Sequence, residues 1–196
     1  MKIIFYDKTS GFLSFLWRIG AWIAIRRGHA DVAVAVSTWE EMINCIGNTS
    51  ASLHPLSVIQ LWGHGGPGRP LIDSSSLDAL RMSKLGAALA THVNMIKIMK
   101  GASPIFVWRS CAVFNGLLGQ GFARQCARTL QCRVAAFTYN IGWRWGWQSG
   151  LRYASPEEPI IVDWTFTEGS LGDGRIAWSE SGAPSTIWCM SDITKE

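Results

Sequence analysis

Two short apolar runs decide the fold: VIQLWGHGG at residues 58–66 and IFVWRSC at residues 105–111. Each has the length and the β-branched and aromatic content of a buried strand. The first continues into His64 and two glycines, and the second ends on Cys111. Open α/β sheets keep their sites at the carboxyl ends of parallel strands. We therefore expect His64 and Cys111 to lie side by side at one edge of a parallel sheet.

Predicted strands and helices alternate around these two runs. Further strands are expected at residues 2–6, 31–36 and 133–138, and helices at residues 12–26, 37–46, 77–90 and 117–130. Residues 65–76 are rich in Gly, Pro and Ser, which is typical of a loop. The alternation predicts an α/β fold with a mostly parallel central sheet and helices on both faces.

The pattern changes after Tyr139. A loop with Trp143, Trp145 and Trp147 follows, and short strands are expected at residues 160–166, 175–179 and 186–190, with a turn at residues 172–174. We expect one domain over residues 1–196. Its α/β core spans residues 1–140, and residues 141–196 form a Trp-rich loop and an antiparallel C-terminal addition.

The composition indicates a large buried fraction. Of the 196 residues, 48% are hydrophobic and only 16% are charged, against roughly 25% charged in an average domain. The net charge is +4 and the basic residues are scattered rather than clustered, so binding to nucleic acid is not expected.

Cysteine and histidine spacings give no sign of a metal site or of disulfides. The cysteines are odd in number, five, and contain no CxxC pair. No spacing matches a zinc pattern, so we expect no metal ligands. A reducing, cytoplasmic location is the simplest interpretation.

Residues 11–25, GFLSFLWRIGAWIAI, form the longest apolar run and are shorter than the roughly 20 residues that span a bilayer. Asp7 before the run and Arg18 within it make a poor signal peptide. A helix packed on the sheet is the main expectation. An interfacial helix with Trp17 and Trp22 at headgroup level is the alternative, so membrane association stays open.

His64 and Cys111 could together perform nucleophilic catalysis. Cys111 lies between a strand end and a helix start, where a helix N-terminus can lower the pKa of a thiol. His64 could act as general base and then as general acid. The backbone N–H groups of Gly65 and Cys111 are candidate oxyanion-hole donors, and a glycine there permits close approach of a substrate carbonyl.

The pair His64-Gly65, followed on the next buried strand by Ser110-Cys111, resembles the caspase-like cysteine peptidases. That group includes caspases, gingipains, clostripain, separase and bacterial CHAT-type domains. The resemblance covers about residues 58–138, and the separation of 47 positions between His64 and Cys111 is close to the roughly 50 of caspases. The run GQGFARQCARTLQCRVAAFT, residues 119–138, also looks like bacterial members.

The resemblance implies a cysteine endopeptidase that needs no metal or organic cofactor and acts on peptide or protein substrates. Tyr139, Trp143, Trp145 and Trp147 are then candidates for an apolar substrate-binding wall. The caspase pentapeptide is absent around Cys111, so aspartate specificity is not implied. A preference for basic side chains would need an acid such as Asp163 or Glu168 in the substrate pocket. Every histidine precedes Cys111, which excludes a papain-type order with this cysteine.

Two alternatives stay open. The fold could be a catalytically inactive binding or scaffold module that uses the Trp-rich loop as its contact surface. The string HGGPG at residues 64–68 also occurs in α/β-hydrolase peptidases, but that fold needs a later G-x-S-x-G and a later histidine. Neither follows here. Substrate preference and oligomeric state are left open.

Overall fold

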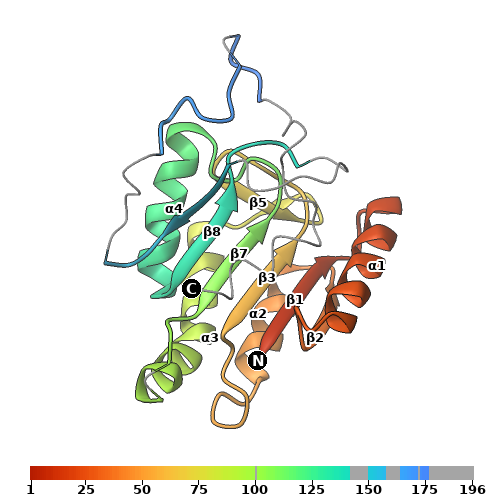
Figure 1. Cartoon of the computed structure of the whole chain (residues 1–196), viewed down its shortest axis with the longest axis vertical. Coiled ribbons are helices and arrows are strands. Elements are labelled where there is room, and N and C mark those ends of the chain that lie inside the picture. The colour runs from red at the N-terminus through yellow and green to blue at the C-terminus, as the bar shows by residue number, and fades with distance from the viewer. Residues whose placement is uncertain (100, 142–149, 158–163, 172, 177–196) are drawn as a thin grey trace.

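The computed structural model describes residues 1–99, 101–141, 150–157, 164–171 and 173–176. A six-stranded sheet forms its centre, with strand order β2-β1-β3-β7-β8-β9 (Figure 1). The strands are β1 (Lys2–Asp7), β2 (Val32–Val36), β3 (Val58–Trp62), β7 (Ile105–Arg109), β8 (Arg133–Phe137) and β9 (Leu151–Ala154). The first five run parallel to one another, and β9 is antiparallel to β8. The predicted α/β class with a mostly parallel sheet is confirmed.

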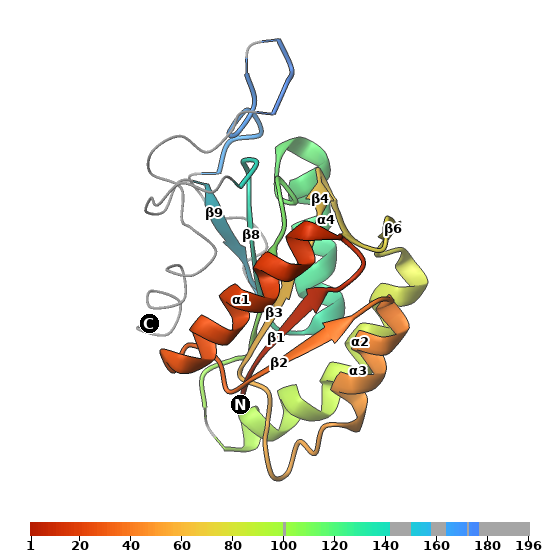
Figure 2. The same ribbon diagram turned by 90° about the vertical axis from the view of Figure 1, so that its right-hand side faces the viewer.

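Helices cover both faces of the sheet, as predicted (Figure 2). Helix α1 (Phe12–Arg26) lies on one face. Helices α2 (Trp39–Asn48), α3 (Ala79–Ile98) and α4 (Gly116–Leu130) lie on the other. In the described residues, no helix is long and apolar enough to cross a bilayer.

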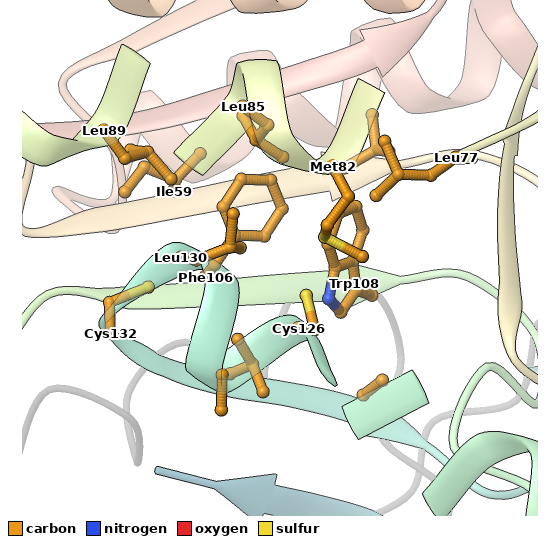
Figure 3. Packing of buried hydrophobic residues seen from close by; sticks show 14 of the residues in the cluster. Ile59, Leu77, Met82, Leu85, Leu89, Phe106, Trp108, Cys126, Leu130 and Cys132 are labelled. Carbon is orange, nitrogen blue, oxygen red and sulfur yellow. The ribbon is translucent and has the colours of Figure 1, made fainter. Parts of the chain in front are cut away.

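Successive side chains of each strand pack on opposite faces, which divides the core in two. The larger part lies between the sheet and helices α2, α3 and α4. Residues of this part that Figure 3 labels are Ile59, Leu77, Met82, Leu85, Leu89, Phe106, Trp108, Cys126, Leu130 and Cys132. On the other face, Ile4 and Trp62 meet the small side chains of Ala21 and Ala24 under α1. A separate small cluster there contains Val58, Ile105, Val107 and Ala135.

Residues 65–76 were predicted to be a loop, and this prediction was wrong. They form a small antiparallel sheet of β4 (Gly65–Gly66), β5 (Arg69–Ile72) and β6 (Ser75–Ser76). Gly68 adopts φ 71°, which a tight turn between β4 and β5 requires and glycine tolerates best. Ile72 is fully buried, so the hairpin also contributes to the core.

Helix α3 runs to Ile98, beyond the predicted end at residue 90. Its buried residues continue at helical spacing through His92, Val93 and Ile96. Gly86, expected to be a weak point, lies within the helix where α3 crosses α4, and a side chain would not fit there.

The predicted C-terminal strands are largely not found where the structure describes the chain. Residues 164–166 are not a strand, and only an isolated bridge joins Ser170 to Ile176. The remaining parts, residues 160–163 and 177–196 with Gly172 of the expected turn, lie outside the described residues. The antiparallel strand that is present is β9, which the sequence interpretation missed. It extends the sheet beyond residue 140.

Candidate active site

The register of two neighbouring strands brings His64 and Cys111 to the same edge of the sheet. Trp62 and Arg109 are the last partners in the parallel ladder between β3 and β7. His64 and Cys111 each lie two residues beyond that pair. Both therefore occupy equivalent positions past the carboxyl ends of adjacent strands, where α/β sheets place their sites.

The imidazole of His64 is exposed and rests against helix α1. Its ring packs edge-on against Trp17, with 5.5 Å between the ring centroids. The carbonyl of His64 accepts a hydrogen bond of 2.9 Å from the N–H of Leu71, which fixes the start of the hairpin. The side chain is therefore supported on one side and open to solvent on the other.

Gly65 packs the segment that carries His64 against the loop that carries Cys111. This cysteine loop comprises residues 110–115, between β7 and α4. A Cβ atom at Gly65 would lie 2.8 Å from both Ser110 Cβ and Val113 Cγ2, and 3.0 Å from the carbonyl oxygen of Cys111. Such distances are too short for real side-chain contacts, so only glycine fits without a shift of the backbone. A second link is the 2.9 Å hydrogen bond from the N–H of Gly68 to the carbonyl of Val113. The two halves of the site are held together by direct backbone packing.

The thiol of Cys111 is half-buried beside Ile141. The N–H of Ile141 donates to Sγ at 3.3 Å, and the S–H lies 4.0 Å from the carbonyl oxygen of the same residue. Burial raises the pKa of the Cys111 thiol, and the Ile141 N–H opposes this shift. The net direction is upward, so the thiol is protonated in the free protein.

The expectation that a helix N-terminus lowers this pKa was wrong. Helix α4 begins at Gly116, and a turn that includes Ala112 at φ 51° separates it from Cys111. Burial is the largest influence on the Cys111 thiol, so its pKa is raised rather than lowered.

Backbone hydrogen bonds around Cys111 limit the choice of oxyanion donors. The N–H groups of Ala112 and Phe114 already donate to the carbonyls of Tyr139 and Phe137. The peptide that joins His64 to Gly65 is trans, and its carbonyl points to β5. The N–H of this peptide belongs to Gly65 and lies opposite the carbonyl, so it points away from the hairpin. The N–H groups of Gly65 and Cys111 remain the candidates.

Asn115, which the sequence analysis did not assign a role, connects the cysteine loop to a distant segment. Its amide nitrogen donates to the carbonyls of Thr138 and Glu168 at 2.8 and 3.0 Å, and its oxygen accepts from Ser170. The partners lie up to 55 positions away, so no local sequence signal could have predicted the network.

Glu168 is already ion-paired and does not suit the role of a specificity acid. Its carboxylate receives a bidentate interaction from Arg152 and a 2.9 Å hydrogen bond from the Thr138 hydroxyl. A substrate cation would have to compete with Arg152. The other acid considered, Asp163, lies outside the described residues.

Of the predicted substrate wall, the structure describes only Tyr139. It is half-buried, and its carbonyl accepts the hydrogen bond from Ala112, next to Cys111. Trp143, Trp145 and Trp147 lie outside the described residues.

A separate groove of about 460 Å³ lies between the hairpin and the first turns of α3 and α4. Its apolar lining includes Leu77, Met82, Leu118 and Phe122. Neither His64 nor Cys111 lines this groove, so the groove and the reactive side chains are different places. We take His64 and Cys111, rather than the groove, as the candidate active site, because a thiol and an imidazole can perform chemistry.

A thiol, an imidazole and two backbone donors at one sheet edge are the groups that thiol-dependent acyl transfer requires. Among the described residues, no cluster of His, Cys, Asp or Glu side chains could hold a metal ion. Comparisons of the chain with protein-family models, curated proteins and solved structures found no significant match.

Proposed function

We propose that this protein is a cysteine endopeptidase of the caspase-like type, with Cys111 as nucleophile and His64 as general base. One observation carries the proposal. His64 and Cys111 lie at equivalent register positions beyond the paired ends of β3 and β7, with Gly65 packed on the cysteine loop.

In the proposed reaction, His64 removes the proton from the thiol as Sγ attacks the substrate carbonyl. The N–H groups of Gly65 and Cys111 stabilise the resulting oxyanion. When the C–N bond breaks, the imidazolium returns the proton to the leaving amine, and an acyl thioester remains on Cys111. Water, deprotonated by His64, then hydrolyses the thioester and restores the thiol.

The raised pKa of Cys111 favours general-base activation over a preformed thiolate. Because the buried thiol holds its proton in the free protein, the proton must leave during the attack. In this proposal the exposed imidazole of His64 serves first the thiol and then the leaving group.

The test measures cleavage of a mixed peptide library by the wild type and by Cys111→Ala and His64→Ala, with products identified by mass spectrometry. Cys45→Ala is the matched control, because Cys45 is also a free, half-buried cysteine but lies on α2. We expect cleavage by the wild type and the control. Cys111→Ala should be inactive, and His64→Ala should be slower by about 10²- to 10⁴-fold.

A non-catalytic binding module is the second candidate, and the covered thiol favours it. The contacts with Ile141 and the upward pKa shift both reduce the reactivity of Cys111. If this alternative is correct, the wild type leaves the whole library intact and its Cys111 reacts no faster with iodoacetamide than Cys45.

A further inference from the structure

Helix α1 is apolar on both of its sides. Its inner side, with Gly20, Ala21 and Ala24, packs on the sheet. Its outer side carries large apolar residues with high exposed fractions: Phe12 71%, Phe15 56%, Ile19 40%, Trp22 57% and Ile25 37%. Steps of three and four residues place these side chains in one stripe. The outer side of a helix that packs on a sheet is normally polar.

Positive charge accompanies the stripe. Arg18 and Arg26 lie on the same exposed side, and Arg27 caps the helix end. No aspartate or glutamate occurs from Lys8 to Ala30. The guanidinium of Arg26 lies 4.9 Å from the ring centre of Trp22, so cation and aromatic ring form one surface. We call Phe12, Phe15, Arg18, Ile19, Trp22, Ile25 and Arg26 the α1 outer face.

From these features we propose that the α1 outer face docks on a bilayer with anionic headgroups. Aromatic and aliphatic side chains at this spacing insert into the headgroup boundary, and the arginines pair with lipid phosphates and carboxylates. The helix lies flat on the surface, because its inner side is held by the sheet. Figure 2 shows the helix on the face of the sheet opposite α2 and α3, so neither of these helices packs against it.

Charge favours a bilayer over a second copy of the chain as the partner of the α1 outer face. An isologous dimer through the α1 outer face would place this acid-free basic helix against its own copy. Like charges that meet at an interface repel each other. An anionic surface provides the opposite charge.

Docking would bring the candidate active site close to the lipid surface. Trp17 lies on α1 and contacts the His64 ring, so the site is next to the docking helix. Membrane docking does not depend on the peptidase proposal, because no residue of the α1 outer face belongs to the proposed chemistry.

The test is co-sedimentation of the full chain with vesicles of phosphatidylcholine alone and with vesicles that contain about one third phosphatidylserine. We expect binding to the second kind, weakened by salt. A Phe15→Ser/Trp22→Ser variant should lose binding. Arg18→Gln should weaken it about fivefold, the effect of one basic residue near such a surface. Leu80→Ser is the matched control, since Leu80 on α3 is at least as exposed as Phe15 and Trp22.

Circular dichroism of each variant checks that it is folded. The proposal is overturned if the wild type does not sediment with either kind of vesicle. It is also overturned if the α1 variants bind as well as the wild type, or if Leu80→Ser loses binding equally. Dimerisation that depends on Trp22 without vesicle binding would identify a second copy as the partner instead.

Discussion

Gly65 has no room for a side chain, because a Cβ atom there would lie 2.8 to 3.0 Å from atoms of Ser110, Val113 and Cys111. We expect Gly65→Ala to displace the histidine segment from the thiol loop and to slow peptide cleavage by at least about tenfold. A shift of about 1 Å in a catalytic arrangement can cost this much or more. Steady-state cleavage of a library peptide provides the measurement.

Gly66→Ala is the matched control for this change. A Cβ atom there would meet only the flexible side chain of Arg69, at 3.9 Å. Its activity should remain close to that of the wild type. Equal activity of the Gly65 and Gly66 variants would show that the close packing has no role in positioning the site.

Cys132 gives stability a pH dependence. Burial raises the pKa of Cys132 from its ordinary value of 9.0 to about 12. Above pH 9 the unfolded chain loses this proton while the folded chain keeps it, so the free energy of unfolding falls as pH rises from 9 towards 12. The slope from one such group is at most about 1.4 kcal/mol per pH unit.

Urea unfolding between pH 8 and pH 11 measures this slope, and Cys132→Ala should reduce it. Cys45→Ala should change it less, because Cys45 is only partly buried. Identical slopes for the wild type and Cys132→Ala would contradict the assignment of a buried, protonated thiol at this position.

At the scale of elements, the crossing of α3 and α4 depends on Gly86. A Cβ atom at this position would lie 2.6 Å from the carbonyl oxygen of Thr129. Gly86→Ala gains helix propensity but must push the two helices apart, and we expect a net loss of about 1–2 kcal/mol in the free energy of unfolding.

Gly121→Ala on α4 is the opposite case, since nothing lies within 4 Å of the added atom. Only the propensity gain remains, so this variant should be more stable by about 0.5–1 kcal/mol. Urea denaturation of both variants gives the comparison. A stabilised Gly86→Ala would mean that the helices do not cross this closely.

Elements with strong periodicity could be predicted, and elements built by long-range contacts could not. The runs at 58–62 and 105–109 are mostly apolar because the strands are buried on both faces, and Gln60 and Arg109 are their only polar residues. The β4–β6 hairpin has a Gly- and Pro-rich sequence that also fits an irregular loop. Strand β9 is held by its pairing with β8, and the four residues LRYA give little local signal.

At the scale of the whole molecule, the parallel pairing of β3 with β7 brings His64 and Cys111 to the same edge of the sheet. The sequence could predict that His64 and Cys111 share an edge, because each directly follows a strand. It could not predict the surroundings of the thiol, since Ile141 lies 30 positions away and burial reverses the expected pKa direction. The sequence allowed an interfacial helix with both Trp17 and Trp22 at headgroup level, but the structure packs Trp17 against His64 and leaves Trp22 exposed. The sequence could not separate the two tryptophans, because an apolar pattern does not show which side of a helix a sheet covers.

The most direct test of the His64–Cys111 pair is the rate of iodoacetamide labelling at each cysteine of the folded protein, followed by peptide mass mapping. Cys45 serves as the internal reference in the same sample. We expect His64→Ala to slow labelling of Cys111 by at least about tenfold near neutral pH, with the Cys45 rate unchanged. Equal Cys111 rates in the wild type and in His64→Ala would contradict the account, because the imidazole would then not assist the thiol.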